Sequence, residues 1–381
     1  MNSLKKITYL DYNATTPVDK RVIDVINIHF TELYGNASSL YSFGNKSKLA
    51  VDNARSNIAD IISSNPNEVY FTSGATESLN LALKGLALYP SNTKKHIVTC
   101  KTEHKAVLET CEYLETLGFD VSYLPVDHDG RIDLDLLKET IKADTLLVCL
   151  MWVNNETGVI HPIREIGKIT QEGNVYFICD GTQGIGKIPL DIVENNIDIL
   201  CFSGHKIYAP KGIGGLYISQ DLIKQNKIQA QIHGGGQENG LRSGTYNVPL
   251  IAGMGKAFEI ASEEMLQNAE QLTQLRDFLE AELLKIGRAF INGQNAPRLF
   301  NTVNICIPGL ETEVFIGMNR DIAISNGSAC TSALIQPSHV LLAMGLDHNN
   351  AMDSIRISMG KHTTIEDLKI LINRIHVFMD S

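Results

Sequence analysis

"VYFICDGTQGIGKIPLDIVENNIDILCFSGHKIYAPKGIGGLYIS" (residues 175–219) is the stretch that decides the fold. It contains three short apolar runs, "VYFICD", "DILCFSG" and "GGLYIS", each of which ends in polar residues. Runs of this length that are rich in β-branched and aromatic residues are typical of buried strands. The stretch therefore predicts three strands with polar side chains at their ends.

The same alternation extends from residue 68 to about residue 220. Four further apolar runs, "EVYFTSG", "KHIVTC", "VSYLPV" and "TLLVCLMWV", are separated by segments with helical periodicity. Strands that alternate with helices are typical of an α/β fold, here a mostly parallel seven-stranded sheet with helices on both faces. In such sheets ligands bind beyond the carboxyl ends of the strands, so we expect the chemistry there.

A second, smaller α+β unit is predicted towards the C-terminus. A Gly-rich segment (233–245) precedes a long amphipathic helix (251–285), and strands near 302–307 and 355–360 and a final helix (364–379) follow. We expect a large domain of residues 16–255. The small domain would then comprise 1–15 and 256–381 and carry a mobile loop at 325–333.

Composition excludes several classes of protein. The 381 residues are 44% hydrophobic and 20% charged, which is typical of a globular protein. The formal charge of −10 argues against direct binding of nucleic acid by this chain. The N-terminus has no apolar stretch long enough for a signal peptide, and the longest apolar run is too short to span a bilayer. We expect a cytoplasmic protein that does not bind membranes.

The seven cysteines show neither CxxC nor Cys/His ligand spacing, so we expect no disulfide framework and no metal site. Four of them lie in apolar runs and are predicted to be buried and inert: Cys149, Cys179, Cys201 and Cys306. Cys100 and Cys111 flank a candidate site. Cys330 differs, because "SNGSACTSA" (325–333) offers no hydrophobic face for packing.

Three motifs at predicted strand ends carry the candidate chemistry. In "FTSGATESLN" (71–80), Thr76 begins a helix whose N-terminus could bind an anion, but capping by Glu77 fits equally well. Lys206 directly follows a buried strand, where a desolvated amine suits Schiff-base chemistry. Asp180 ends the preceding strand and is either a helix cap or the carboxylate that pairs with a protonated pyridine nitrogen.

Along nearly its entire length the sequence resembles the group I cysteine desulfurases of the class V aminotransferase family. The resemblance rests on several long motifs in the family's order. They are "YLDYNATTP" (9–17), "FTSGATES" (71–78), "KTEHKAVL" (101–108), "VNNETG" (153–158), "DGTQ" (180–183), "SGHKIYAPKGIGGLY" (203–217), "HGGGQENGLRSGT" (233–245) and "GSACTSA" (327–333).

The resemblance implies a homodimeric fold type I enzyme that depends on pyridoxal 5'-phosphate. It implies that Lys206 forms the Schiff base with the cofactor, that Asp180 keeps the pyridine nitrogen protonated, and that His104 stacks on the ring. Asn155 and Gln183 would lie near the ring hydroxyl. The phosphate would be bound by Ala75, Thr76, Ser203 and His205, and by Thr245 from the neighbouring subunit.

For the substrate, the resemblance implies L-cysteine, which is converted to L-alanine. Cys330 would attack the substrate sulfur as a thiolate, hold it as a persulfide and pass it to an acceptor protein. Arg356, with Asn155, would bind the substrate, because its planar guanidinium suits a carboxylate; a plain ion pair at the surface or at the edge of the core is the alternative. His104 could likewise be an ordinary exposed helix start.

Two other interpretations of the sequence compete with a cysteine desulfurase. A different class V enzyme, such as a selenocysteine lyase or an aminotransferase, would not need Cys330, and a partner-binding scaffold would not bind the cofactor. The chain also departs from the family in "YGNASSLYSFG" (34–44, including Tyr41), at Gly181, which should loosen packing against the ring, and at Asn239, which removes a cation.

The chain stops at "HVFMDS", without the C-terminal extension of housekeeping relatives. In those relatives the extension engages the iron–sulfur scaffold, so its absence favours a dedicated acceptor, such as a partner in tRNA thiolation or DNA phosphorothioation. Iron–sulfur assembly stays a third possible pathway, since the sequence does not select among them.

Overall fold

The computed structural model of the chain describes residues 7–326 and 336–380. Its largest sheet has seven strands in the order β2-β8-β7-β6-β5-β3-β4. The strands are β2 (Val69–Thr72), β3 (His96–Cys100), β4 (Asp120–Leu124), β5 (Thr145–Met151), β6 (Tyr176–Asp180), β7 (Ile199–Ser203) and β8 (Gly214–Ile218). From β7 to β4 all neighbours are parallel, whereas β8 is antiparallel to both β7 and β2. The seven predicted strands and the mostly parallel sheet are confirmed.

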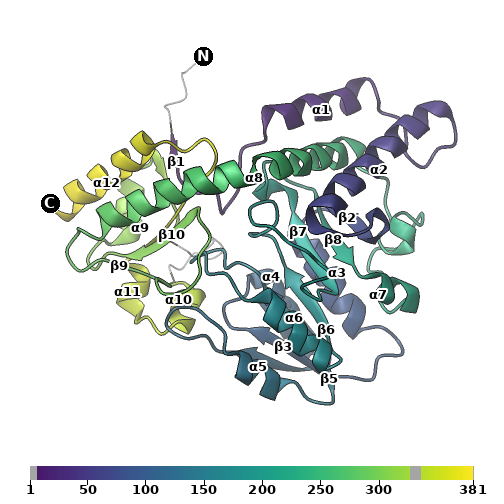
Figure 1. Cartoon of the computed structure of the whole chain (residues 1–381), viewed down its shortest axis with the longest axis horizontal. Helices are drawn as coiled ribbons and strands as arrows, with labels where there is room; N and C mark the ends of the chain where they lie inside the picture. Colours follow the sequence, from purple (N-terminus) through teal and green to yellow (C-terminus); the bar gives the residue numbers. More distant parts are fainter. Residues whose placement is uncertain (1–6, 327–335, 381) are drawn as a thin grey trace.

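Helices cover both faces of this sheet (Figure 1). On one face Ile178 of β6 packs in a core with α3 (Ala75–Ala87), α4 (Lys105–Glu115) and α7 (Gln220–Gln225). Its neighbours Phe177 and Cys179 point to the other face, which is covered by α2 (Ser42–Ile62), α6 (Ile163–Glu172) and α8 (Val248–Leu283). Both faces of the strands are therefore buried, which explains why their sequences are continuously apolar.

The long helix α8 connects the large sheet with the C-terminal part of the chain (Figure 1). Its N-terminal half packs against α1 (Lys20–Thr31) and α2, and Phe258 contacts Phe202 of β7 edge to face, with 5.5 Å between the ring centroids. Its C-terminal half reaches β10 (Thr302–Cys306) and α12 (Ile365–Met379). The predicted long helix is confirmed, within three residues at each end.

The C-terminal part contains two small sheets. In one, β10 pairs antiparallel with β12 (Ser354–Ser358) and with β9 (Phe290–Ile291). In the other, β1 (Thr8–Tyr9) pairs parallel with β11 (Ile322–Ala323). The remaining helices are α5 (Leu134–Thr140), α9 (Thr312–Met318), α10 (His339–Ala343) and α11 (His348–Met352). The predicted strands near 302–307 and 355–360 and the final helix are confirmed.

The division into domains at residues 255 and 256 stays a prediction, because α8 runs continuously through that boundary. Within 7–326 and 336–380, no helix combines the length and the apolar character needed to cross a bilayer.

Candidate active site

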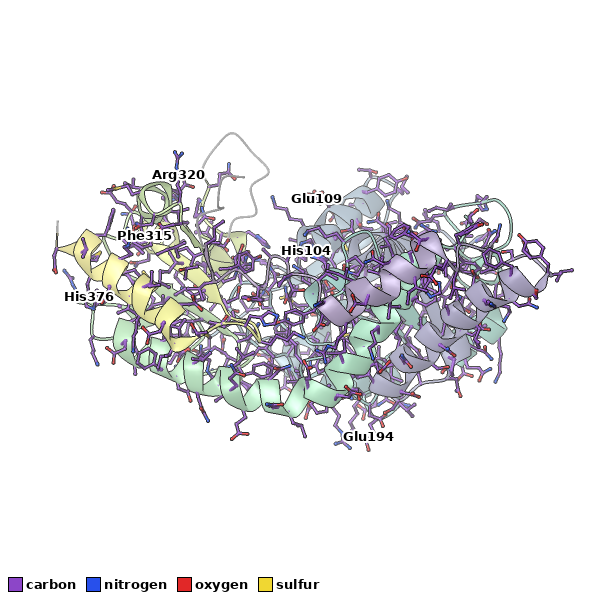
Figure 2. All side chains as sticks on the ribbon, turned by 90° about the horizontal axis from the view of Figure 1, so that it is seen from above. His104, Glu109, Glu194, Phe315, Arg320 and His376 are labelled. Atoms are coloured by element: carbon purple, nitrogen blue, oxygen red, sulfur yellow. The ribbon has the colours of Figure 1, made fainter. Side chains whose placement is uncertain are left out.

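Polar residues gather where the central strands of the large sheet end. Asp180 is the last residue of β6, and Ser203 is the last residue of β7. Lys206 lies in the short 3₁₀ helix η2 (Gly204–Lys206) directly after β7, and His104 follows β3 and caps α4. Figure 2 shows His104 near the middle of the molecule, between the C-terminal elements and the N-terminal helices. The carboxyl edge of the sheet is therefore the candidate site.

The amine of Lys206 is held by the N-terminal segment. It donates hydrogen bonds to the backbone oxygens of Asn13 and Ala14, the latter at 2.8 Å. Burial and the positive charge of Arg356 lower the pKa of Lys206 to about 8, although the two nearby carboxylates of Asp11 and Asp180 act in the opposite direction. The neutral form of this amine is therefore much more populated near neutral pH than it is in a lysine of ordinary pKa, as a nucleophilic lysine requires.

His104 has a defined tautomer in its neutral form. Its Nδ1 accepts a hydrogen bond from the backbone N–H of Ala106 at 3.1 Å, so the ring proton lies on Nε2. The residue is exposed at the helix start, but the surrounding protein and Lys206 lower the pKa of its ring, while Asp180 raises it. The interpretation of His104 as an exposed helix start is confirmed, while its stacking on the cofactor ring stays a prediction.

Arg356 on β12 is buried, so a surface ion pair is wrong, but the alternative of an ion pair at the edge of the core is present, with Asp11. Its two terminal nitrogens donate to the backbone oxygen of Asn155 at 3.0 Å and to the Asp11 carboxylate at 2.8 Å. Its Nε is buried and has no hydrogen-bond partner among the described residues. A buried guanidinium N–H without a partner is costly, and a ligand carboxylate would satisfy it.

Asn13 links several of these groups, and the sequence analysis assigned it no role. Its backbone oxygen accepts from Lys206 and, at 3.0 Å, from the side-chain amide of Gln183. Its own side-chain amide donates to the backbone oxygen of Asn155 at 3.2 Å. Asn13 lies in the motif "YLDYNATTP" (9–17), which the chain shares with the family, and this motif is the sequence feature that could have indicated its role.

The N-terminus of α3 faces the end of β7. Its cap is Gly74, whose backbone is so close to β8 that a Cβ at Gly214 would lie 2.5 Å from the Gly74 Cα. The Ser203 hydroxyl lies 3.7 Å from the position that a Cβ of Gly74 would take. Ala75 and Thr76 therefore offer free helix N–H groups next to a hydroxyl, which is an arrangement that binds phosphate.

The contacts of Glu77 show how it acts at the start of α3, where the sequence left open capping by Glu77 or anion binding. Its carboxylate accepts hydrogen bonds from the backbone and hydroxyl of Ser73, at 2.9 and 2.6 Å, and pairs with Arg242 at 2.8 Å. Glu77 thus caps the turn at Ser73, which leaves the N–H groups of the following residues available. Capping by Glu77 is confirmed, and it is compatible with anion binding at the N-terminus of α3, which stays a prediction.

His205 and Thr245 are the two other residues that were predicted to bind the phosphate. His205 shares a hydrogen bond of 3.2 Å with the Thr15 hydroxyl, and burial and neighbouring lysines lower its pKa to about 4, so its ring is neutral. Thr245 is exposed and lines a cavity of about 320 Å³ together with Ser73 and Arg242 of the same chain. The assignment of Thr245 to the neighbouring subunit stays a prediction.

All six described cysteines are buried. Burial raises the pKa of each of these thiols, to about 11 for Cys100 and about 12 for Cys111. The predicted inert character of the four cysteines in apolar runs is confirmed. Cys330 lies outside the described residues.

Residues on either side of 327–335 contact the site. Ser325 exchanges two backbone hydrogen bonds with Arg356, at 3.2 and 2.7 Å. Ser338 caps α10 and donates its hydroxyl proton to the buried carboxylate of Glu156, the neighbour of Asn155. Burial raises the pKa of Glu156 to about 7, against the effects of Ser338, Arg356 and Lys105. The chain thus enters and leaves this segment next to groups of the candidate site.

Two of the sequence departures have a structural explanation. A Cβ at Gly181 would lie 2.6 Å from Cδ1 of Leu200, so Leu200 occupies the space that the methyl group of an alanine would need. The expected loosening of packing against the cofactor ring stays a prediction. Asn239 has a φ of 56°, in the left-handed region that asparagine tolerates better than most residues. Tyr41 is exposed and precedes α2.

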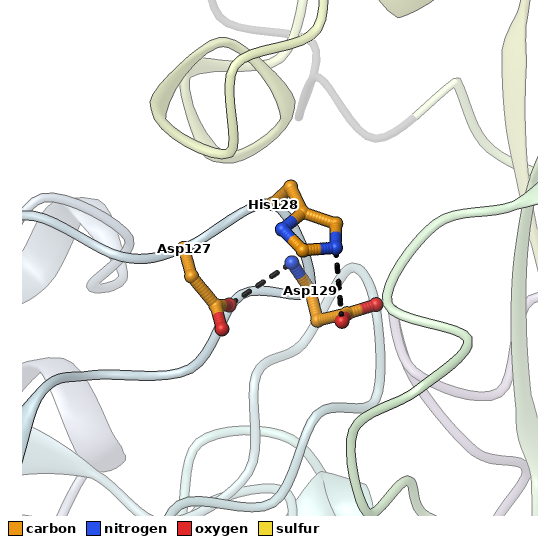
Figure 3. A group of neighbouring side chains, drawn as sticks. All are labelled: Asp127, His128 and Asp129. Atoms are coloured by element: carbon orange, nitrogen blue, oxygen red, sulfur yellow. Dashed lines mark hydrogen bonds and ion pairs between the residues drawn. The ribbon is translucent and has the colours of Figure 1, made fainter.

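One group of possible metal ligands lies away from the site, at Asp127, His128 and Asp129 (Figure 3). Arg131 pairs with both carboxylates, at 2.9 and 3.3 Å. The positive charge of this guanidinium already compensates the two carboxylates, so we do not assign a metal site to these three residues.

The residues at the carboxyl edge fit pyridoxal 5'-phosphate. Lys206 supplies an amine with a lowered pKa, and Asp180 supplies a carboxylate at the end of the neighbouring strand. Ala75 begins a helix whose first N–H groups are free. These are the groups that bind the aldehyde, the ring nitrogen and the phosphate of this cofactor.

Comparison with known proteins agrees with this geometry. The family model of the class-V aminotransferases matches residues 8–371. The cysteine desulfurase IscS of Histophilus somni (strain 129Pt) is 47% identical over 97% of this chain and 92% of its own length. The enzyme of the same name from Rickettsia akari (strain Hartford) is 46% identical over 98% of this chain and 92% of its own length.

Solved structures of similar proteins share the whole fold. A NifS-like protein has a TM-score of 0.91 at 37% identity and covers 98% of this chain and 99% of its own. SspA in complex with cysteine has a TM-score of 0.85 at 37% identity and covers 93% and 99%. DndA from Streptomyces lividans has a TM-score of 0.78 at 40% identity and covers 91% and 98%. The chain therefore belongs to the class-V aminotransferase family, among its pyridoxal phosphate-dependent cysteine desulfurases.

Proposed function

We propose that this chain converts L-cysteine to L-alanine and holds the released sulfur as a persulfide on Cys330. The Cβ–S bond of the substrate breaks, and a new S–S bond forms with the Cys330 thiolate. Cβ gains the electron pair and a proton and becomes the methyl group of alanine, while the transferred sulfur is oxidised. The step is balanced without an external oxidant or reductant.

The observation that carries the proposal is the environment of Lys206. Its amine is mostly desolvated, has a pKa of about 8, and lies near Asp180 and Arg356. Pyridoxal 5'-phosphate, when bound, supplies the electron sink that makes the Cα–H of the substrate acidic. Lys206 would hold its aldehyde carbon, Asp180 its ring nitrogen, and Ala75, Thr76, Ser203 and His205 its phosphate, with Asn155 and Gln183 near the ring hydroxyl.

The protein's own groups would then orient the substrate and move protons. The Nε–H group of Arg356 would bind the α-carboxylate of the substrate, since this nitrogen has no hydrogen-bond partner among the described residues. The neutral amine of Lys206 accepts the Cα proton. His104 would lie against the ring and offer its Nε2–H as a proton donor, because its Nδ1 accepts the hydrogen bond from the Ala106 N–H.

Cys330 is proposed as the nucleophile because the other cysteines are unsuited to the role. The six described thiols are buried, and their raised pKa values keep them protonated at neutral pH. The small residues around Cys330 in "SNGSACTSA" offer no hydrophobic surface that would bury it.

Three variants test the assignment. Lys206→Ala should remove the borohydride-trappable adduct between the protein and pyridoxal phosphate. Cys330→Ser should keep this adduct but form no persulfide, as measured with ³⁵S-labelled L-cysteine and alanine release. Cys306→Ser, at a buried thiol of β10, is the matched control and should transfer sulfur like the wild type. Full sulfur transfer by Cys330→Ser would favour the alternative of another class V activity.

We also propose a homodimer in which Thr245 binds the cofactor phosphate of the neighbouring subunit. Mixing Lys206→Ala subunits with Thr245→Val subunits tests this arrangement. If Thr245 acts across the interface, the mixed dimer has one complete site and regains activity above that of either variant. If Thr245 acts within its own chain, the mixture stays as inactive as its components.

The sulfur acceptor is proposed to be a protein of iron–sulfur assembly, tRNA thiolation or DNA phosphorothioation. The net charge of −10 disfavours a nucleic acid as the direct acceptor. Incubating the ³⁵S-persulfide form with candidate acceptor proteins, and then locating the label, distinguishes these pathways. Label that moves directly to RNA or DNA without a protein would contradict the proposal.

A further inference from the structure

A second lysine, Lys187, lies beside the reactive Lys206, and neither the resemblance nor the proposed mechanism gives it a role. It follows β6 in the turn "DGTQGIGK" (180–187). Lys187 and Lys206 line the same small cavity, of about 40 Å³, together with Asn301. The side chain of Lys187 donates a hydrogen bond of 3.1 Å to the Oε1 atom of Gln183.

Lys187 has an unusual environment for a lysine inside a protein. Lys361, which is only 8% exposed, is paired with the carboxylates of Asp19 and Glu264. Lys187 forms no ion pair with a carboxylate in the described part of the chain. Burial and the charge of Lys206 lower its pKa to about 7. Burying an amine without a countercharge costs stability, so a merely structural lysine would be unexpected at this position.

The hydrogen bond from Lys187 determines which way the Gln183 amide points. A side-chain amide has one oxygen and one NH₂ group, and only the oxygen can accept from the lysine. With Oε1 held by Lys187, the NH₂ group of Gln183 is directed to the other side, where it donates to the backbone oxygen of Asn13 at 3.0 Å. A neutral amine still carries N–H donors, so this orientation persists above the pKa of Lys187.

Asn13 connects this pair to the reactive lysine. The backbone oxygen that accepts from Gln183 also accepts from the amine of Lys206. A rotated Gln183 amide would present its oxygen to the Asn13 oxygen, and the two acceptors would repel each other. The position of the N-terminal segment against Lys206 therefore depends on the orientation of Gln183.

We propose that Lys187 is a positioning residue of the active site: it fixes the Gln183 amide so that its NH₂ group faces the cofactor hydroxyl and the Asn13 carbonyl. This inference rests on the proposed function, in which Gln183 lies near the ring hydroxyl. Lys187 would act through Gln183 in this arrangement, since its hydrogen bond is to the Oε1 atom of that residue.

The test is a double-mutant cycle on cofactor affinity. Trp152 is the only tryptophan, is 4% exposed, and donates its backbone N–H to Asp180, so its fluorescence reports binding of pyridoxal phosphate to the apo-protein. Lys187→Met, which keeps the chain length but removes the donor, should weaken binding about fivefold, the effect of one neutral hydrogen bond. Gln183→Leu should weaken binding at least as much.

The decisive measurement is the double variant. If Lys187 acts through Gln183, adding Lys187→Met to Gln183→Leu causes no further loss of affinity. Lys187→Arg keeps a donor and should bind within about twofold of the wild type. Lys94→Met is the matched control. Lys94 likewise donates a hydrogen bond, to the backbone oxygen of Thr145 at 2.8 Å, but this residue is the first of β5 and lies at the opposite end of the strand from the site.

Several outcomes would overturn the inference. Wild-type affinity in Lys187→Met, or losses that add in the double variant, would show that Lys187 does not act through Gln183. If Lys187→Met does not fold, Lys187→Arg takes its place. An affinity loss in Lys187→Arg as large as that in Gln183→Leu would then also show that Lys187 does not act by donating to Gln183. A wild-type protein that forms no trappable adduct at Lys206 would instead contradict the proposed function itself.

Discussion

Substituting Glu156 by glutamine should change the pH dependence of stability. The Glu156 carboxyl is 3% exposed, and burial raises its pKa from 4.5 to about 7. The folded protein therefore binds a proton that the unfolded chain releases between these pH values. The stability that this proton contributes is complete below pH 4.5 and is lost as the pH rises through 7.

The size of the effect follows from the pKa change. One pKa unit corresponds to about 1.4 kcal/mol, so the wild type should lose roughly 2 to 3 kcal/mol between pH 5 and pH 8 from this group. Glu156→Gln has no proton to lose. The hydrogen bond from Ser338 to the ionised carboxylate is already included in the pKa of about 7, and any difference between the two proteins that does not depend on pH cancels when their changes with pH are compared.

The assay is urea unfolding of the apo-proteins at pH 5, 6, 7 and 8, followed by the fluorescence of Trp152, which lies just beyond the same strand end as Glu156. The free energy of unfolding of Glu156→Gln minus that of the wild type should increase by about 2 to 3 kcal/mol across this range. Glu165→Gln, on the exposed first turn of α6, controls for the loss of one negative charge. An identical difference at pH 5 and pH 8 would refute the reasoning.

Three further predictions concern the site and the core. Asp180→Asn should lower the rate of alanine formation about a hundredfold or more, because an amide cannot keep a pyridine nitrogen protonated; a rate within threefold of the wild type would contradict this role. Arg356→Lys should raise the KM for L-cysteine about tenfold with a smaller change in kcat, since lysine cannot make a bidentate contact; an unchanged KM would exclude Arg356 as the carboxylate ligand. Phe202→Ala should cost about 3 to 5 kcal/mol in urea unfolding, because Phe202 is fully buried against Phe258; a loss below 1 kcal/mol would mean that the core there can collapse.

The architecture was predictable because it depends on local patterns. The apolar runs of β6 and β7 have Asp180 and Ser203 as their last residues, and their amphipathic partner α8 shows three- and four-residue spacing. Each of these features involves neighbours in the sequence, so the pattern is readable without knowing the fold. Even the placement of Asp180 and Lys206 at one edge followed, because parallel strands end at the same side of a sheet.

The resemblance to a family then identified most of the site, but it did not describe the contacts. Lys206 binds Asn13, which lies 193 positions away, and Arg356 binds Asp11, which lies 345 positions away. These partners have no periodic relation that a sequence pattern could reveal. The roles of Asn13 and Lys187 were therefore missed, although Asn13 lies in the motif "YLDYNATTP" (9–17) and Lys187 follows "DGTQ" (180–183) by four residues.

By itself the sequence determined the elements, their order in the chain and the chemical types at the strand ends, because strand and helix periodicity are properties of adjacent residues. Only the tertiary structure decided protonation and orientation. The lowered pKa of Lys206, the raised pKa of Glu156 and the fixed amide of Gln183 arise from burial and from contacts between distant segments. Desolvation depends on everything packed around a group, so it exists only once the chain has folded.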